Sequence, residues 1–402
     1  MALASPSERS PSRAARPDLQ QRVSVARLTL TGFRCYDRQR LETGPEPVVL
    51  TGPNGAGKTT LLEAVSLLSP GRGLRRARLD EIGRRTGDQP AADWAVAAQI
   101  RTATGAVDIG TGRSAAAAAQ ARDRRQVRID GHPAKSQSAL AAIVGVTWVT
   151  PEMDRLFVDG TAARRRFLDR LVFGIDPAHA GRVGAYERAL QQRARLLRRG
   201  QADPAWLTAL EEIMAADGVA VAAARRDLVV RLSRASTEGG GPFPGAMLAT
   251  SGAVESWLDE APALVAEDRL REALADSRRL DAEAGGAAVG PHKSDLKVSH
   301  AASGRSAAAC STGEQKVLLI AIVLAAARLQ ATERASTPVL LLDEVAAHLD
   351  ARHRAALFEA VAALDAQAWY AGTDVGLFEP LAGRAQFFAV EGGSATRRRG
   401  DG

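Results

Sequence analysis

One segment of the chain has the residues that wrap a nucleotide phosphate. Positions 52–59 read Gly-Pro-Asn-Gly-Ala-Gly-Lys-Thr, which fits G-x-x-x-x-G-K-[ST] throughout. Glycines let backbone N–H groups curl around phosphate oxygens, where a side chain would intrude. Lys58 supplies a compact positive charge to the β- and γ-phosphates, and the Thr59 hydroxyl is a Mg²⁺ ligand. The predicted nucleotide-binding residues are Gly52, Pro53, Asn54, Gly55, Ala56, Gly57, Lys58, Thr59 and Thr60.

Two acids follow a run that is typical of a buried strand. The run 339–342 is apolar at every position, as in a parallel sheet covered by helices, and Asp343 and Glu344 follow it. Asp343 would hold Mg²⁺ beside Thr59, and Glu344 would orient and polarise the attacking water. An acidic pair that only ends a strand and caps a helix is the alternative, which the upstream phosphate loop disfavours. The predicted catalytic residues are Lys58, Asp343 and Glu344, and the predicted Mg²⁺ ligands are Thr59 and Asp343.

A third segment combines a helix cap with an apolar helix. It precedes the apolar run that begins at Val317 and consists of Ser311, Thr312, Gly313, Glu314, Gln315 and Lys316. Serine and glycine suit a helix N-terminus that can bind an anion. Taken alone, the segment is equally well explained as an ordinary N-cap.

The elements around these residues are typical of an α/β fold. A short β-branched run at 48–50 precedes the phosphate loop, and a helical pattern follows it. From about 150 to 284 the strand signals give way to helical periodicity, and strand-like runs return at 295–298, 339–342 and 369–371. We therefore expect a P-loop NTPase head, split between residues 24–150 and 285–390. A helical insertion lobe at 151–284 would interrupt it, and disordered tails at 1–22 and 391–402 would flank it.

The composition permits several partners and excludes other classes of protein. The formal net charge is +7, but the chain has only five lysines among its 53 basic residues, and richness in arginine and alanine is typical of a GC-rich genome. The basic balance is therefore weak evidence for nucleic acid. Two cysteines favour a reducing compartment over a disulfide scaffold, and the histidines form no zinc-like cluster. The apolar run at 317–327 is too short for a bilayer, which needs about 20 residues.

The third segment and the acidic strand together resemble the signature motif of ABC-type ATPases. In that family the loop contacts the γ-phosphate held by the other subunit, which would make Ser311, Thr312, Gly313, Glu314 and Gln315 a signature acting in trans. Asp350 in Ala-His-Leu-Asp at 347–350 matches the family's D-loop, which lies at the same dimer interface.

Across nearly the whole ordered chain, the sequence resembles the RecF family of bacterial DNA-repair ATPases. The matching stretches, in the family's order, are 30–36, the phosphate loop running into 61–64, 68–73, 150–154, 164–170, 290–293, 311–316 and 340–350. The chain departs from the family where Thr60 replaces a frequent Asn and Lys293-Ser294 replaces Arg-Asp. No Q-loop glutamine is evident, although 150–152 occupies that region, and 372–374 lacks the switch histidine of transporter ATPases.

The resemblance implies both a fold and a function. It implies an ABC-type head that binds ATP and Mg²⁺, an ATP-dependent homodimer, and slow ATP hydrolysis stimulated by DNA. The DNA would be gapped or carry a single/double-strand junction, and RecR and RecO would be partners in loading RecA. The resemblance also implies a cytoplasmic protein of DNA replication, repair and the SOS response, without a membrane partner.

The length of the insertion argues against a long coiled-coil arm. About 130 helical residues in two antiparallel halves reach at most about 100 Å, and no sustained heptad pattern is present. SMC proteins, which share this head, carry much longer coiled coils. A compact helical lobe is therefore expected.

Clusters of arginine are candidates for DNA contact, although a solvated face explains each of them as well. The first consists of Arg72, Arg75 and Arg76 with Arg78, and further clusters lie at 122–128 and 193–199. The triplet at 164–166 is expected to pair with Asp159 and Asp169. Aromatic residues make up 4% of the chain, so a backbone-held duplex or junction is favoured over a base-stacking platform.

Two alternatives remain. The first is the ATPase subunit of a membrane transporter, which predicts a Q-loop glutamine and a switch histidine that the sequence does not clearly offer. The second is a DNA-binding structural clamp with a vestigial ATPase, which an intact Glu344 argues against.

Overall fold

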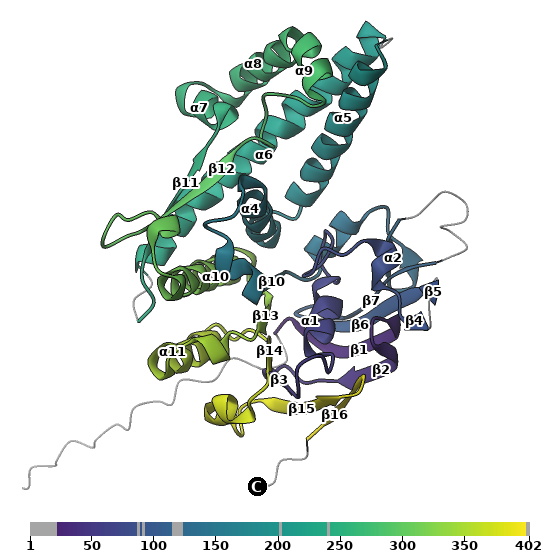
Figure 1. The fold of residues 1–402 in the computed structure, drawn as a ribbon, viewed down its shortest axis with the longest axis vertical. Coiled ribbons are helices and arrows are strands. Elements are labelled where there is room, and N and C mark those ends of the chain that lie inside the picture. Colours follow the sequence, from purple (N-terminus) through teal and green to yellow (C-terminus); the bar gives the residue numbers. More distant parts are fainter. Residues whose placement is uncertain are drawn as a thin grey trace, which may run out of the picture.

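The computed structural model describes residues 22–86, 89–90, 93–114, 124–200, 203–238 and 242–398, and its described part has two regions (Figure 1). A head contains both large sheets, and a lobe of helices extends from it. The head is built from two separate stretches of the chain, with most of the lobe inserted between them. The predicted tail at 1–22 lies outside the described residues except for Arg22, which pairs with Asp365.

The first sheet of the head is antiparallel and has the order β2-β1-β6-β7-β8-β9. Alternate residues of β6 are buried, which is the pattern of a sheet with one face on the core. Strand bounds are β1 Ser24–Phe33, β2 Tyr36–Glu42, β6 Trp94–Thr102, β7 Gly105–Arg113, β8 Gln126–Ile129 and β9 His132–Pro133, with a small separate pair β4 Arg85–Thr86 and β5 Gln89–Pro90.

The second sheet carries the predicted chemistry and has the order β10-β13-β14-β3-β15-β16. Its first five strands are parallel, and four of them are buried along their whole length, as expected for strands covered on both faces. The bounds are β3 Val48–Thr51, β10 Val146–Val149, β13 Val339–Asp343, β14 Ala368–Gly372, β15 Gln386–Glu391 and β16 Ser394–Arg397.

This parallel sheet is the middle of three layers. Leu340 and Leu342 face one hydrophobic core, which they share with α10 (Thr312–Arg334) and α11 (Ala351–Ala363). Leu341 faces a second core, which it shares with α1 (Lys58–Ser66) and the antiparallel sheet. Because the carboxyl ends of parallel strands meet at one edge of the sheet, the phosphate loop after β3 and the acids at the end of β13 lie on the same side of the head.

The insertion forms a lobe around two antiparallel helices, α5 and α6, with a core of its own. The longest helix, α6, has 35 residues, which at about 1.5 Å per residue is about 52 Å, well below the reach of an extended arm. The lobe helices are α4 Thr161–Ile175, α5 His179–Arg199, α6 Pro204–Glu238, α7 Ala253–Glu260, α8 Ala263–Asp276 and α9 Arg278–Ala284, while the short α2, Leu79–Ile82, belongs to the head.

The lobe is not purely helical, which corrects the sequence prediction. Strand β11, Ala246–Ser251, lies inside the segment expected to be helical. It pairs antiparallel with β12, Asp295–His300, which the sequence predicts to belong to the head. A six-residue strand beside a glycine-rich loop gives little periodicity to recognise. The predicted C-terminal tail is also corrected, because 394–397 form β16 and pair with β15.

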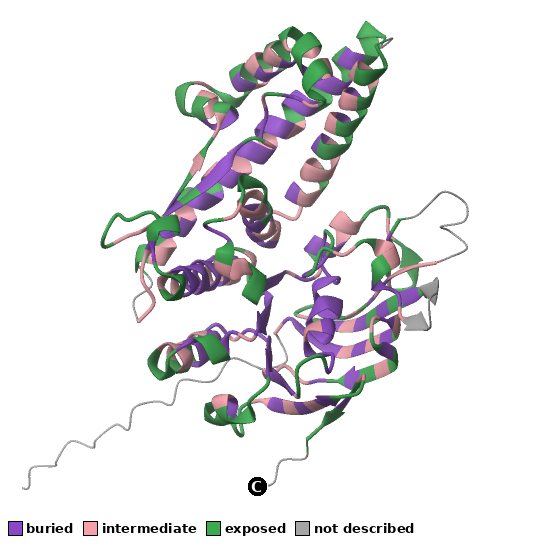
Figure 2. Cartoon of the chain, viewed as in Figure 1, coloured by how far each residue is buried: buried purple, intermediate pink, exposed green. Residues whose placement is uncertain are grey.

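Helix α10 is, among the described residues, the one helix long and apolar enough by composition to cross a membrane. Its buried side chains, which include Leu318, Ile322 and Ala325, pack in the core of the head. Figure 2 shows this helix as mostly buried, which is the state of a core helix.

Candidate nucleotide-binding site

The phosphate loop has the backbone conformation that its glycines predict. Gly52 has φ 158° and Gly57 has φ 116°, and a Cβ at Gly52 would lie 2.0 Å from the carbonyl oxygen of Val390. A Cβ at Gly57 would lie 2.6 Å from the hydroxyl of Tyr36, which donates to the Gly57 carbonyl at 3.2 Å. Both positions are therefore sterically closed to larger residues, and α1 begins within the motif, at Lys58.

The Lys58 ammonium lies within the loop, where only 5% of the residue is exposed. Its Nζ donates to the carbonyl oxygens of Gly52 at 2.8 Å and Pro53 at 3.0 Å. The carboxylate oxygen Oε1 of Glu344 lies 3.7 Å from the same Nζ. One positive charge thus stands between the loop that would hold phosphate and the acid predicted to orient water.

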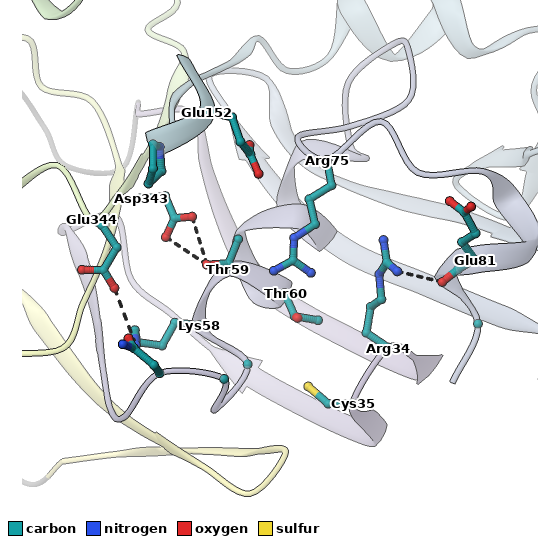
Figure 3. Close-up of a pocket in the computed structure, with 15 residues that line it drawn as sticks. Arg34, Cys35, Lys58, Thr59, Thr60, Arg75, Glu81, Glu152, Asp343 and Glu344 are labelled. Atoms are coloured by element: carbon teal, nitrogen blue, oxygen red, sulfur yellow. Dashed lines mark hydrogen bonds and ion pairs between the residues drawn. The ribbon is translucent and has the colours of Figure 1, made fainter. Parts of the chain in front are cut away.

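Thr59 and Asp343 lie together, as the sequence predicts. The Thr59 hydroxyl is 2.9 Å and 3.1 Å from the two carboxylate oxygens of Asp343 (Figure 3). A hydroxyl and a carboxylate at this separation are hard oxygen ligands of the kind Mg²⁺ uses together with nucleotide phosphates, so the residues present fit that ion. Burial raises the pKa of Asp343 to about 6, the hydrogen bond from Thr59 opposes the rise, and the Glu344 charge adds to it.

The backbone holds Glu344 in an uncommon conformation. Its φ is +53°, in the left-handed region, and its N–H donates to the carbonyl oxygen of Ala371 on β14 at 3.0 Å. A non-glycine residue in this region costs of the order of 1 kcal/mol or more, and such residues concentrate at functional sites. The turn directs the chain away from the sheet directly after Asp343.

These residues line one cavity of about 910 Å³, which Figure 3 shows. Sequence reasoning identified part of its wall but gave no role to Arg34. The other end is formed by residues of the first sheet and of the loop after α1. The lining residues are Arg34, Cys35, Asn54, Gly55, Gly57, Lys58, Thr59, Thr60, Arg75, Glu81, Gly83, Pro151, Glu152, Asp343 and Glu344.

Two arginines add positive charge to the cavity. Arg34 makes two hydrogen bonds to the buried carboxylate of Glu63, at 3.0 and 2.8 Å, and a third to the carbonyl oxygen of Glu81 at 2.7 Å. Arg75 lies 3.5 Å from the same carboxylate. Arg75, which the sequence analysis groups with the candidate DNA contacts, also lines this cavity. The shared partner, Glu63, is 29 positions from Arg34, so no local pattern could have identified this cluster.

The region expected to replace the Q-loop forms part of the same wall. Pro151 and Glu152 of the 3₁₀ helix 151–155 line the cavity. Two residues later, Asp154 accepts a hydrogen bond from Lys316 at 3.0 Å, and Lys316 is buried near the start of α10. The cavity wall and the signature helix are thus joined by an ion pair.

The signature segment does not line this cavity. Ser311 caps α10, where its hydroxyl accepts from the Glu314 N–H at 3.3 Å and its own N–H donates to the Glu314 carboxylate at 2.7 Å. Ser311, Thr312 and Gly313 are exposed, whereas Gln315 is buried and donates to the carbonyl oxygen of Cys310 at 2.9 Å. Within one chain, this segment is a helix cap that faces solvent.

Asp350 also acts as a cap. Its carboxylate accepts from the His353 N–H at 2.8 Å at the start of α11 and lies 2.7 Å from the His353 ring nitrogen Nδ1. These bonds to His353 lower the pKa of the exposed Asp350. Its carboxylate is therefore an anion at neutral pH, on the surface of the head.

The arginine clusters have different surroundings. Arg72 and Arg76 are exposed in the loop after α1, and the charge of Arg76 acts on Arg166 of α4, across the junction of head and lobe. Arg125 is buried and donates to the carbonyl oxygens of Ser69 and Gly71, whereas Arg122 lies outside the described residues.

The predicted pairing of the triplet at 164–166 was wrong. Arg164 pairs with Asp295 at 2.7 Å instead of Asp169. Its bond to Asp159 is to the backbone carbonyl and not to the carboxylate. Arg225 takes Asp169 instead, with both bonds at 2.7 Å.

Known proteins resemble the chain along most of its length. A model of the RecF/RecN/SMC N-terminal domain matches residues 24–371. A DNA replication and repair protein RecF of Mesorhizobium japonicum is 48% identical over 373 residues, which are 92% of this chain and 97% of that protein. One of Caulobacter vibrioides is 49% identical, over 90% of this chain and 95% of that protein.

A solved structure of the recombination mediator RecF with ATP shares the fold. It superposes with a TM-score of 0.79 at 22% identity, and the match covers 94% of this chain and 99% of that one. The fold is therefore that of an ABC-type ATPase head with an inserted lobe. The family model and the close relatives show that the chain belongs to the RecF family.

Proposed function

We propose that this chain is a DNA-repair ATPase in which ATP joins two copies around DNA. The observation that carries the proposal is the division of the site within one chain. Lys58, Thr59, Asp343 and Glu344 converge on the cavity, while Ser311 and Gly313 lie exposed outside it. A second copy that presented its own signature segment to the bound γ-phosphate would complete the site.

The residues of the cavity divide the chemistry of hydrolysis among them. Lys58 and the loop N–H groups would bind the β- and γ-phosphates, and Arg34 and Arg75 would add charge from the opposite wall. Mg²⁺, held by Thr59 and Asp343, would neutralise charge on the phosphate oxygens. Glu344, fixed by its left-handed backbone, would hold the water in line with the γ-phosphorus and accept its proton.

The proposed DNA substrate and protein partners are those that the resemblance to the RecF family implies. We propose that the clamp acts on gapped DNA or single/double-strand junctions, that DNA stimulates a slow hydrolysis, and that RecR and RecO take part in loading RecA in the cytoplasm. Support comes from the close RecF relatives and from the exposed cations of the head and lobe, such as Arg72 and Arg76. The segment 372–374 supplies no histidine, which disfavours a transporter subunit.

The test measures ATP hydrolysis and dimerisation of wild type and Glu344→Gln, with and without gapped DNA. Because the amide cannot accept the proton but fits the same space, we expect hydrolysis to fall at least 100-fold while ATP still binds. Light scattering should then show a dimer that persists with Mg²⁺-ATP. Lys58→Ala should abolish both ATP binding and the dimer. If the Gln variant hydrolyses normally and stays monomeric, the proposed mechanism is wrong.

A further inference from the structure

One face of α5 carries a row of cations outside the nucleotide site. Arg188, Gln191, Arg195 and Arg198 follow one another at intervals of three, four and three residues, which places them along one side of a helix. Arg188 lines a groove of about 730 Å³ at the junction with the head. The other three line a second groove of about 360 Å³ on the next turns of the helix. Figure 2 shows α5 as largely exposed or intermediate along its length.

The two grooves are positive. The groove at the head also contains Arg124, Arg128 and Lys135 of the first sheet and its following loop, with Glu187 as the one acid among its lining residues. The groove further along α5 contains Arg195, Arg198 and Lys293, and no acid is among the described residues that line it. We call Arg188, Arg195, Arg198 and Lys293 the α5 strip.

The strip cations differ from two other arginines of α5, which are paired with acids. Arg182 pairs with Asp176 at 2.5 Å, and the buried Arg193 pairs with Glu211 and Asp281 at 2.8 and 2.7 Å. In the described part of the chain, no carboxylate lies within 4.0 Å of a strip cation, although Asp217 on α6 feels the charge of Arg188. Like charges along these two neighbouring grooves repel each other, and an anionic ligand would offset that repulsion.

The backbone around Lys293 is fixed by hydrogen bonds. Its N–H donates to the carbonyl oxygen of Gly290 at 2.9 Å, in a turn fixed to the lobe by Arg225, which donates to the Pro291 carbonyl at 2.7 Å. The adjacent His292 lies 2.6 Å from the hydroxyl of Tyr186 on α5 and 2.9 Å from the carbonyl oxygen of Ala287. Burial lowers the pKa of His292, so the ring is neutral and can accept from Tyr186 while it donates to Ala287.

We propose that the α5 strip holds the phosphate backbone of a DNA duplex. From Arg188 to Arg198 the helix rises about 15 Å, which spans about four phosphates of one strand at about 3.4 Å of duplex axis per phosphate. Among the described residues that line the two grooves, Phe173 and His292 are the two with aromatic rings, so base stacking has little support and backbone contact has more. The inference rests on the proposed DNA-binding function and locates part of the duplex on the lobe.

The test compares the triple variant Arg188→Ala/Arg195→Ala/Arg198→Ala with wild type. A matched control, Arg234→Ala/Arg271→Ala/Arg279→Ala, removes the same charge from exposed lobe positions outside both grooves. Binding of a labelled gapped duplex to the full chain is measured by anisotropy with Mg²⁺-ATP, from 50 to 300 mM salt. Circular dichroism and ATP binding check that each variant is folded.

The expected result follows from counterion release. Three lost phosphate contacts reduce the slope of log K against log salt by about 2.7 and, at 0.1 M salt, weaken binding by up to about 500-fold. The control should keep the wild-type slope. A strip variant with the wild-type slope, or a control that loses as much, overturns the inference while leaving the proposed function intact.

Two further outcomes separate the rival explanations. If the wild type itself binds no DNA with ATP, the proposed function fails as well. If the strip variant keeps its affinity for DNA but loses binding to a polyglutamate peptide that the wild type binds, the strip is a site for an acidic protein, and the inference is wrong.

Discussion

Replacing Asp169 with Asn should destabilise the lobe in a way that depends on pH. Asp169 lies on α4 and is almost fully buried. Both of its carboxylate oxygens accept from Arg225 of α6 at 2.7 Å, and Nε2 of the buried His179 lies 2.9 Å from one of them. Because Arg225 also donates to the Pro291 carbonyl, this carboxylate joins three helices to the segment that leads to β12.

The size of the effect follows from the charges. Asparagine keeps the shape but leaves the Arg225 guanidinium buried without its counter-ion, which costs about 3–5 kcal/mol in comparable sites. Burial alone would raise the pKa of Asp169, but the charge of Arg225 and the hydrogen bonds from His179 and Arg225 lower it to about 2, against 3.8 for an unperturbed aspartate. At 1.36 kcal/mol per unit, the lowered pKa corresponds to about 2 kcal/mol of pH-dependent stability.

The sign of the pH dependence is fixed by this lowered pKa. The stabilisation is fully present above the pKa of the unfolded chain and is lost as pH falls from about 4 through about 2. The difference in unfolding free energy between wild type and Asp169→Asn should therefore shrink by about 1 kcal/mol between pH 5 and pH 3, roughly half of the ionisation contribution.

Urea unfolding followed by far-UV circular dichroism at pH 7, 5 and 3 measures this difference. Asp227→Asn is the control, because Asp227 is exposed and pairs with Arg231 one turn away on the same helix, a contact worth about 0.5 kcal/mol or less. A loss below 1 kcal/mol for Asp169→Asn at pH 7, or a loss that is unchanged at pH 3, would refute the assignment of the network.

Two further predictions concern the nucleotide site. Ser311→Arg should leave ATP binding within about twofold of wild type, because Ser311 lies outside the cavity. The variant should not form the ATP-dependent dimer in light scattering, because Ser311 is proposed to contact the nucleotide of the second copy. A dimer of normal stability would contradict a signature acting in trans. Gly57→Ala should lose ATP binding in a fluorescent-nucleotide titration, because its Cβ would meet the Tyr36 hydroxyl at 2.6 Å. Gly131→Ala is the control, because Gly131 lies outside the cavity and its new Cβ would have no atom within 4 Å. It should bind ATP normally and lose only the cost of its φ of 79°, about 1 kcal/mol of stability. Equal losses of ATP binding in both variants would disprove the steric argument.

The sequence predicts those parts of the site that are encoded by short, continuous motifs. The phosphate loop specifies its own backbone through glycine and its own charge through Lys58, and an apolar strand places Asp343 at its end. Parallel pairing then brings Thr59 and Asp343 together, although 284 positions separate them.

The sequence does not predict ion pairs between residues that are far apart in the chain, or very short strands. Arg75 is exposed and lies in a run of arginines, and its contact with the buried Glu63 of α1, 12 positions before it, leaves no local pattern in the sequence. Arg164 takes Asp295, which is 131 positions away, instead of an acid in its own neighbourhood. The strands β11 and β16 were missed because short strands carry too few residues to show a period.

The order of strands in the parallel sheet has a consequence for the sequence of events during synthesis. Strand β3, which leads into the phosphate loop, lies between β14 and β15, and both of these come from the last 35 residues of the chain. A nascent chain that has emerged only as far as the lobe therefore presents β3 with neither edge paired, and open strand edges invite pairing with other chains. The strand that leads into the nucleotide site is thus fully paired only after β14 and β15 have been synthesised, more than 300 residues after β3.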